Sequence, residues 1–332
     1  MKQTITPLLS LQALTVGYVT SVGSNILFEN LDLGLNAGEL TCFMGPNGIG
    51  KSTLIRTLAG LQTPLAGTVR HAGALLPSGQ KSNGPLPQLT SVVLTDKVTS
   101  VQMNVRELVS FGRYPYLGWN ITLSRDDKDK VEAALAEVHI QHLASHRLFE
   151  LSDGQLQMVM IARALAQETP VILLDEPTAH LDLNNRVEVM NLLRRLARKL
   201  DKAILIATHE LDLALQTADL IWLAGREKTL ITGMPEDLVL SGVFDEVFQF
   251  KGYNLKTGRV QHEAYRGKAV SVSGHGHALL WTKNALERNG FEVISAPSGL
   301  YIEVVGVDDA TTWVLQDGNT FHSLRALLAH LP

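Results

Sequence analysis

Residues 45–53, GPNGIGKST, constrain this chain more than any other stretch of its sequence. Gly45 to Ser52 fit the pattern G-x-x-x-x-G-K-[ST], directly after the apolar run Leu40 to Met44. The following residues, Ser52 to Leu61, have the pattern of a helix, so the glycines stand between a strand and a helix, as a phosphate-binding loop requires. Glycines let backbone N–H groups approach phosphate oxygens, and the helix N-terminus adds partial positive charge. We therefore predict a nucleoside triphosphate site rather than an ordinary glycine-rich turn.

Two side chains of this loop have separate predicted roles. Lys51 reaches the β- and γ-phosphates as a point charge, and the Ser52 hydroxyl holds Mg²⁺. The residues of the loop predicted to bind the nucleotide are Gly45, Asn47, Gly48, Gly50, Lys51, Ser52 and Thr53.

A second motif, VILLDEP, places two carboxylates after an apolar strand. The runs 171–175 and 203–208 are continuously apolar, as in sheets covered on both faces, and the amphipathic stretch 184–200 lies between them. This is the parallel α/β pattern, in which ligand sites lie at the carboxyl ends of strands. We predict that Asp175 organises Mg²⁺ and that Glu176 accepts a proton from, or orients, an attacking water.

The composition of the chain excludes several classes of protein. Its 332 residues are 45% hydrophobic and 19% charged, with a net charge of −4, so no basic excess favours a nucleic-acid partner. The single cysteine, Cys42, cannot form an intramolecular disulfide. The first 18 residues make a poor signal peptide, and no apolar run approaches the roughly 18–20 residues of a membrane span. We expect a soluble protein, or one held at a membrane by a partner.

Between the two motifs, residues 151–166, LSDGQLQMVMIARALA, resemble the signature motif of ABC-transporter ATPases. In that family the helix N-terminus of the signature faces the nucleotide bound by the other subunit of a head-to-tail dimer. The resemblance therefore implies a homodimer that binds ATP with Mg²⁺, to which Ser152, Gly154 and Gln155 contribute from the partner's side.

Further elements of the same family follow in order along residues 8 to 260. Tyr18 matches the aromatic residue that stacks on adenine, Asp182 of AHLD matches the dimer seam, and His209 matches the switch histidine that contacts the γ-phosphate. The implied fold is α/β: a P-loop NTPase of ABC ATPase type, with a parallel-sheet core, an antiparallel β part and a helical subdomain at about 97–165. The ATPase domain is expected at 1–262, with a small α+β domain at 263–332.

A narrower resemblance concerns residues 104–119, NVRELVSFGRYPYLGW, which look like a segment of ATPases that serve importers of iron–siderophore, haem and cobalamin. In that group this region contacts the membrane subunit. The resemblance implies two integral-membrane permease subunits, a periplasmic or lipid-anchored binding protein, no nucleic acid, and a peripheral location at the cytoplasmic face of the plasma membrane. The alternative is a soluble ABC ATPase that acts in a cytoplasmic assembly.

Two positions depart from the family pattern. The strand after the loop ends in Asp96 where the family has glutamine, and the nearby Gln88 is the alternative for that role. Asp153 replaces glycine in the signature, which puts a negative charge near a phosphate site. The predicted catalytic residues are Lys51, Asp96, Glu176 and His209, and the predicted metal ligands are Ser52, Asp96 and Asp175.

The C-terminal residues from about 268 have a β-α-β-β-β-α pattern with no assigned function. We interpret GHGH at 274–277 as a glycine-rich turn at a helix start rather than a metal site, because two histidines without a third ligand are too few. A regulatory or dimer-stabilising role for this unit is a hypothesis. We expect His139, His142 and His146 to lie at helical spacing on the solvated face of a polar helix.

Overall fold

The computed structural model describes residues 6–21, 23–71, 74–75 (backbone only), 86–95, 102–119, 121–225, 228, 230–296, 299–306 and 311–332. The chain divides into two compact units, Met1–Phe248 and Gln249–Pro332. The boundary expected from the sequence, after residue 262, falls inside the second of these units.

The first unit is built on a six-stranded sheet in the order β11-β10-β4-β9-β8-β7. All neighbours in this sheet are parallel except the edge pair β10 and β11. The strands β4, β8 and β9 are buried at every residue, as their continuous apolar runs predict. The strands span Leu40–Met44 (β4), Thr90–Val93 (β7), Val171–Asp175 (β8), Ala203–Ala207 (β9), Leu220–Ala224 (β10) and Leu230–Gly233 (β11).

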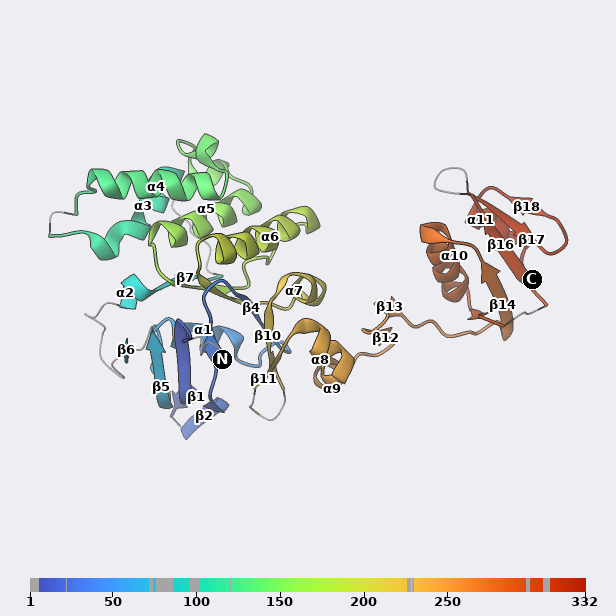
Figure 1. Cartoon of the computed structure of the whole chain (residues 1–332), viewed down its shortest axis with the longest axis horizontal. Helices are drawn as coiled ribbons and strands as arrows, with labels where there is room; N and C mark the ends of the chain where they lie inside the picture. The colour runs from blue at the N-terminus through green and yellow to red at the C-terminus, as the bar shows by residue number, and fades with distance from the viewer. Residues whose placement is uncertain are drawn as a thin grey trace, which may run out of the picture. The chain divides into compact units, whose positions relative to one another are not determined.

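A second, antiparallel sheet packs against this core (blue in Figure 1). Phe28 from this sheet meets Phe43 of β4 edge to face, with ring centroids 5.7 Å apart, and both rings are fully buried. Helix α1 (Lys51–Leu58) contacts strands of both sheets. The strands of the second sheet are β1 (Leu9–Thr20), β2 (Gly23–Leu31), β3 (Gly34–Leu35), β5 (Ala66–His71) and β6 (Ala74–Leu75).

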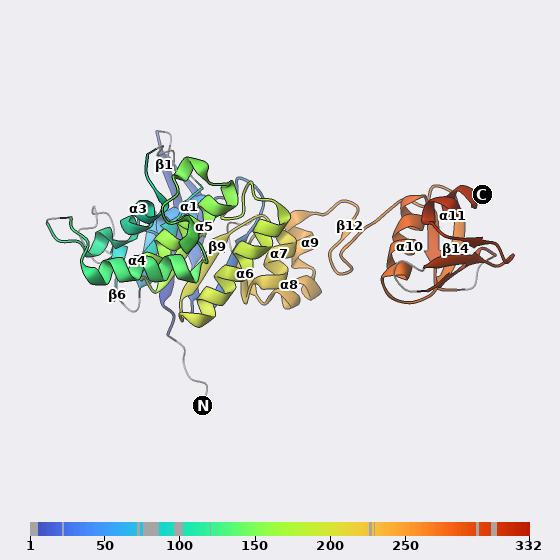
Figure 2. The ribbon, with the colours of Figure 1, turned by 90° about the horizontal axis from the view of Figure 1, so that it is seen from above.

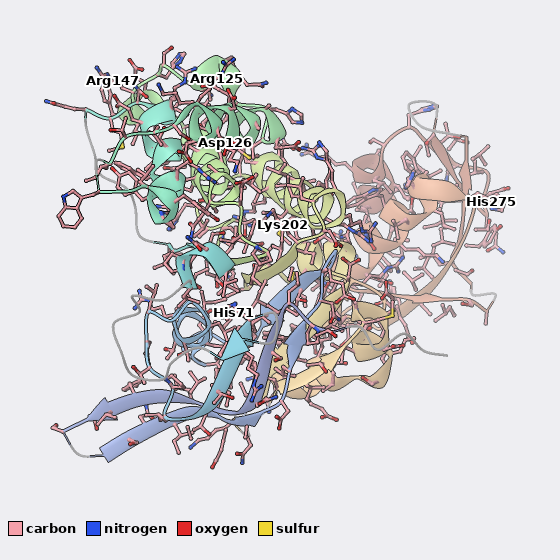
Figure 3. All side chains as sticks on the ribbon, turned by 60° about the vertical axis from the view of Figure 1, so that its left-hand side comes forward. His71, Arg125, Asp126, Arg147, Lys202 and His275 are labelled. Carbon is pink, nitrogen blue, oxygen red and sulfur yellow. The ribbon has the colours of Figure 1, made fainter. Side chains whose placement is uncertain are left out.

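His71, the last residue of β5, is buried within this unit (Figure 3). Its Nδ1 lies 2.9 Å from the Thr90 hydroxyl, which joins β5 to the start of β7. Burial lowers the pKa of the His71 imidazole to about 4, so the ring is neutral in the folded protein at neutral pH.

The helical subdomain, green in Figure 1, is a set of capped helices. Asn104, Ser124 and Ser152 each form a capping box with the acidic or amide side chain three residues later. Its elements are α3 (Val105–Ser110), the 3-10 turn η1 (Phe111–Tyr116), α4 (Arg125–Glu137), the 3-10 turns η2 (Gln141–Leu143) and η3 (Leu148–Glu150), and α5 (Asp153–Ala166). The other helices of the unit are α2 (Leu86–Leu89), α6 (Leu183–Lys199), α7 (Leu211–Thr217), α8 (Pro235–Ser241) and α9 (Val243–Phe248).

The expectation that three histidines share one helix is wrong. Helix α4 ends at Glu137, and His139 has a left-handed backbone conformation with φ of +59°. His142 then lies in η2 and His146 in the turn that follows. The histidine at 139 instead contacts Arg195 of α6, with 3.1 Å between the ring nitrogen and the guanidinium.

The second unit, orange to red in Figure 2, has its own core. Its five-stranded sheet has the order β15-β14-β16-β17-β18, and α10 and α11 contact each other and the sheet. This confirms the small α+β domain predicted from the sequence. The elements are β12 (Tyr253–Asn254), β13 (Arg259–Val260), β14 (Lys268–Ser273), α10 (Gly276–Arg288), β15 (Phe291–Ile294), β16 (Tyr301–Val305), β17 (Thr312–Leu315), β18 (Thr320–Phe321) and α11 (Leu324–His330).

None of the helices in the described ranges combines the length and the apolar character needed to cross a bilayer.

Candidate nucleotide-binding site

The glycine-rich loop joins β4 to α1, as the sequence predicts, and its backbone needs glycine. Gly48 and Gly50 have φ of +78° and +110°, in the region that side chains disfavour. A Cβ on Gly50 would lie 2.7 Å from Leu27 Cδ1, and one on Gly45 would lie 2.8 Å from Ala224 Cβ. The loop is thus a closely packed turn whose shape cannot be kept with side chains at these positions.

Lys51 is folded into this loop. Its ammonium group donates a hydrogen bond to the Gly45 carbonyl at 3.0 Å, and Lys51 as a whole is only 7% exposed. Burial lowers the pKa of Lys51, and the nearby carboxylates of Glu176 and Asp175 oppose that shift. A buried cation in a glycine loop is suited to a strongly negative group such as a phosphate.

The other groups of the loop lie nearer the solvent. Asn47 and Gly48 are exposed at its tip, and Ser52 is exposed in the first turn of α1, while Thr53 is half-buried. The first turn of α1 has no acidic residue, so nothing in it opposes an anion at this helix start.

The carboxylate of Glu176 lies between Lys51 and His209. Its Oε2 is 2.6 Å from His209 Nδ1, and its Oε1 is 3.9 Å from Lys51 Nζ. These residues follow β8 and β9, which are neighbours in the sheet with Asp175 opposite Ala207. The parallel order therefore brings together groups that are 33 residues apart in the sequence.

Glu176 also has an unusual backbone. Its φ is +49°, and its N–H donates to the Ala207 carbonyl at 2.8 Å. A left-handed conformation at a residue with a long side chain costs about 1–3 kcal/mol and persists where its surroundings enforce it. The turn after β8 thus holds this carboxylate in one direction, toward Lys51 and His209.

Asp175 and Ser52 offer oxygen atoms of the kind that Mg²⁺ prefers. Asp175 is 2% exposed at the carboxyl end of β8, and the Ser52 hydroxyl is exposed one residue after Lys51. An Mg²⁺ ion keeps several waters and phosphate oxygens as ligands, so one carboxylate and one hydroxyl fit its needs.

The signature residues form the start of α5. The Ser152 hydroxyl accepts from Gln155 N–H at 3.2 Å, and Gln155 Oε1 accepts from Ser152 N–H at 3.0 Å. Gly154 is buried, and a Cβ there would lie 2.9 Å from Asn185 Cγ. Asp153 is exposed in the first turn, where a negative side chain is favourable to the helix dipole.

Asp182 caps the start of α6, next to the signature. Its carboxylate accepts from Asn185 N–H at 2.9 Å and from Asn185 Nδ2 at 3.0 Å. Asn185 thus joins Asp182 to Gly154, a role that the sequence analysis missed because an Asn inside a polar helix gives no signal of its own.

Tyr18 lies on β1 opposite Asn25 of β2 and is 46% exposed. Its hydroxyl accepts a hydrogen bond from Asn25 Nδ2 at 2.7 Å, which fixes the ring while one face stays accessible to a stacking partner.

Of the two candidates for the family's glutamine, Asp96 and Gln88, the structure describes only Gln88. Asp96 lies outside the described residues. Gln88 lies in α2, and its side-chain N–H donates to the Pro115 carbonyl at 3.1 Å. Thr95, the last described residue after β7, lines the same small cavity as Asp175 and Glu176.

A further acidic residue near the site, Glu210, was also missed. Its carboxylate lies 2.7 Å from Arg186 of α6 and 3.7 Å from His209 Nε2. The neighbouring letters of ATHELD were the only signal that could have pointed to it.

Two family models match the chain. The model described as "ABC transporter" covers residues 28–179, and the model described as "Iron ABC transporter C-terminal domain" covers residues 266–332.

Curated relatives resemble most of the first unit. An uncharacterized ABC transporter ATP-binding protein of Methanocaldococcus jannaschii is 36% identical over 74% of this chain and 83% of its own length. A probable siderophore transport system ATP-binding protein of Bacillus subtilis is 36% identical over 72% and 85%. A cobalamin import ATP-binding protein of Halobacterium salinarum is 34% identical over 73% and 60%.

Solved structures agree with this match. An inward-facing ABC transporter assigned to the metal-chelate type is similar at a TM-score of 0.64 and 27% identity, over 74% of this chain and 90% of that one. A dimeric ATP-binding cassette bound to ADP and phosphate is similar at a TM-score of 0.59 and 25% identity, over 68% and 98%.

Proposed function

The chain belongs to the family of ABC transporter ATPases. From this premise we propose that it hydrolyses ATP to power the import of a metal chelate, and that this chelate is an iron–siderophore complex. The observation that supports hydrolysis most directly is the placement of Glu176 between Lys51 and His209. The match of residues 266–332 to an iron-transporter domain supports iron over cobalamin or haem as the cargo.

In the proposed mechanism the loop holds the triphosphate. Backbone N–H groups of 45–53 bind the phosphate oxygens, and the Lys51 ammonium neutralises the β- and γ-phosphates. Tyr18 stacks on the adenine. Ser52 and Asp175 hold Mg²⁺, which when bound neutralises charge on the same phosphates.

Glu176 is the proposed general base. Its left-handed backbone aims the carboxylate, and the 2.6 Å contact with His209 fixes the direction of one oxygen. A carboxylate held in this way accepts a proton from a water that attacks the γ-phosphate in line. His209 also reaches the γ-phosphate itself, so it senses whether hydrolysis has occurred.

A second copy of the chain completes the site in this proposal. Ser152, Gly154 and Gln155 present the capped start of α5 to the nucleotide of the partner subunit, while Asp182 lies at the seam. A helix N-terminus offers N–H donors and positive partial charge to phosphate, so ATP joins the two subunits and its hydrolysis separates them.

The segment that leaves β7 is proposed to couple this chemistry to the membrane subunits. Thr95, which precedes Asp96 in the sequence, lines the cavity of Asp175 and Glu176. Gln88 is tied to the helical subdomain through Pro115 instead. We therefore keep Asp96 as the proposed counterpart of the family's glutamine.

The surface proposed to meet the permease is the end of η1. Tyr114 is 52% exposed, Tyr116 is 38% exposed and Trp119 is fully exposed, so three aromatic side chains are accessible to solvent within six residues. Exposed aromatic groups of this kind are typical of protein contacts. Peripheral attachment at the cytoplasmic face of the membrane follows from that contact.

ATPase activity of the purified chain, alone and with its candidate permease subunits in lipid, tests this function. We expect stimulation by the permease and further stimulation by a binding protein loaded with iron chelate. Activity that is the same with and without those subunits would favour the alternative, a soluble ABC ATPase in a cytoplasmic assembly.

A further inference from the structure

The second unit contains a pocket of about 370 Å³ that the transport function does not use. All its lining residues belong to Gln249–Pro332, so the pocket is complete within this unit. Its size lies in the range of small-molecule sites, roughly 300–1,000 Å³. We propose that it binds a small planar anion, such as an aromatic carboxylate.

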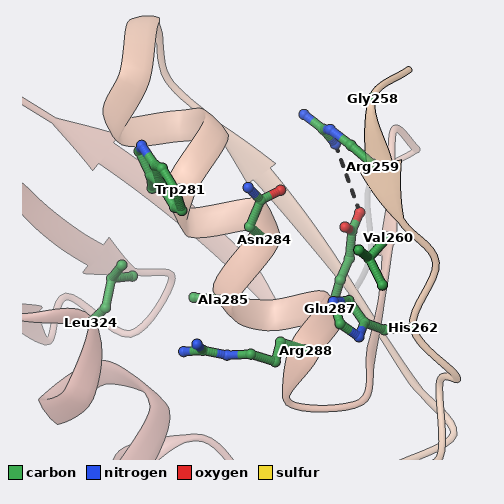
Figure 4. A pocket seen from close by; sticks show the side chains of 10 residues that line it. All are labelled: Gly258, Arg259, Val260, His262, Trp281, Asn284, Ala285, Glu287, Arg288 and Leu324. Atoms are coloured by element: carbon green, nitrogen blue, oxygen red, sulfur yellow. Dashed lines mark ion pairs between the residues drawn. The ribbon is translucent and has the colours of Figure 1, made fainter. Parts of the chain in front are cut away.

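One face of α10 forms the base of the pocket. Trp281, Asn284, Ala285 and Arg288 recur at the i, i+3, i+4 and i+7 positions, which lie on one side of a helix. Figure 4 shows their side chains along the helix, with Leu324 of α11 facing them. The stripe would usually be apolar core, but here it carries an amide and a guanidinium instead.

Trp281 supplies the surface for a planar group. The side chain is 62% exposed, whereas Trp313 of the same unit is 8% exposed and donates a hydrogen bond to Thr282 at 2.7 Å. With Leu324 and the buried Ala285, Trp281 makes an apolar wall and floor. A ring that stacks here removes exposed indole surface from water.

Two arginines provide the charge for an anion. Arg259 and Arg288 line the pocket together with His262 and a single carboxylate, Glu287. Glu287 lies 4.0 Å from Arg259, so it compensates that arginine (dashed line in Figure 4). Within the part of the chain that the structure describes, Arg288 makes no ion pair or hydrogen bond, and its guanidinium fork is free to hold a carboxylate.

Residues 258–262, which line one side of the pocket, are held by hydrogen bonds of Gln261 and, farther along the chain, of Arg266. Gln261 N–H donates to the Gly252 carbonyl at 2.7 Å, and Arg266 donates to the carbonyls of Asn289 at 2.8 Å and Pro332 at 3.0 Å. Arg266 also lies over the Phe291 ring at 4.9 Å. The pocket is therefore preformed, which limits the entropy lost on binding.

The charged lining of the pocket favours a small molecule over a protein as its ligand. Protein interfaces present an apolar core with charge at the edge, but here charged residues stand within the pocket beside one aromatic ring. This inference depends on the second unit alone, so its test is independent of the proposed import of iron.

Titration calorimetry of the whole chain with 1-naphthoate tests it. We expect saturable binding with a Kd of about 1 mM or tighter, from roughly −0.3 kcal/mol per heavy atom. The neutral 1-naphthalenemethanol lacks the carboxylate and cyclohexanecarboxylate lacks the planar aromatic system, so each is expected to bind about tenfold more weakly or worse.

Matched variants locate the site. Arg288→Gln is expected to weaken 1-naphthoate binding about tenfold, since it removes a hydrogen bond to a charged group, and Trp281→Leu to weaken it severalfold. Arg325→Gln, an exposed arginine of α11 outside the pocket, and Trp119→Leu in the other unit should leave it unchanged. Equal affinity in all four variants, or no saturable binding to the wild type, would overturn the proposal.

Discussion

The guanidinium of Arg113 links three parts of the helical subdomain, and we predict that Arg113→Met destabilises it by about 3 kcal/mol. Its Nε lies 2.9 Å from Asp127 of α4, and its Nη1 donates to the Ala166 carbonyl at 2.7 Å and to Glu168 at 2.9 Å. The side chain is 3% exposed. A single substitution thus removes two ion pairs and a hydrogen bond to the C-terminal end of α5.

The size of this destabilisation depends on the partners that Asp127 and Glu168 keep after Arg113 is replaced. Removal of one partner of a buried pair costs about 3–5 kcal/mol, because the other charge is left uncompensated. Asp127 keeps the Ser124 hydroxyl, which holds the pKa of that carboxyl below its usual range more strongly than Arg113 does. Glu168 keeps Lys130 at 2.7 Å. We therefore expect the lower end of that range.

Urea unfolding of the first unit, followed by far-ultraviolet circular dichroism, measures the effect. Arg106→Met is the matched control: it removes an arginine–carboxylate pair with Glu132 in the same subdomain, but one in which both side chains are about half exposed. That pair contributes about 0–1 kcal/mol. Nucleotide binding at low temperature reports whether the loop at 45–53 is intact. If the two variants are equally stable, the assigned role of Arg113 is wrong.

Four further predictions concern the active site and the sheet. Glu176→Gln should keep ATP binding but lower ATPase activity by about a hundredfold or more, and trap a dimer in ATP that gel filtration detects. Lys51→Ala should weaken ATP binding itself in an equilibrium titration. Asp96→Gln should change the permease-stimulated ATPase rate, and an unchanged rate would argue against its placement. Folding lowers the pKa of His71 from 6.5 to about 4, so between these pH values the unfolded chain binds more protons than the folded protein. The free energy of unfolding therefore declines as the pH falls through this window, by about 3 kcal/mol in all. His71→Asn should remove this pH dependence from the midpoints of urea unfolding.

Local sequence patterns predicted the elements of the site well. The loop at 45–53, the strand before Asp175 and the helix at 184–200 were predicted because glycine spacing and apolar runs act within a few residues. The contact between Glu176 and His209 was not itself predicted; it arises because the neighbouring parallel strands β8 and β9 end at one edge of the sheet.

Long-range contacts and unmarked helix ends were not predictable. Helix α4 ends at Glu137 although no glycine or proline marks the end, so the following histidines were misplaced. Arg113 has hydrogen-bond partners 14 and 53 residues away in the sequence, and no pattern within GRYP predicts them. The segment was interpreted as a contact with the membrane subunit, and the structure adds that its arginine is buried while Tyr114 is exposed.

A connected set of polar contacts extends the site beyond the nucleotide loop. Lys51 approaches Glu176 at 3.9 Å, Glu176 contacts His209 at 2.6 Å, His209 lies 3.7 Å from Glu210, and Glu210 pairs with Arg186 at 2.7 Å. The two longest steps are Lys51 to Glu176 and His209 to Glu210, so these are the ones that a bound phosphate can shorten or break at least cost.

This set ends at the surface proposed to join two subunits. Arg186 lies in the first turns of α6, where it also donates to the Leu181 carbonyl at 2.7 Å. One residue earlier, Asn185 is bonded to the Asp182 cap and packs against Gly154 of the signature. A change in the position of His209 is therefore expected to reach α6 through charged groups, and α6 is capped by the seam residue Asp182 and contacts the signature at the start of α5 through Asn185. The nucleotide state of one site is therefore expected to alter the dimer surface of the same chain through this set of contacts.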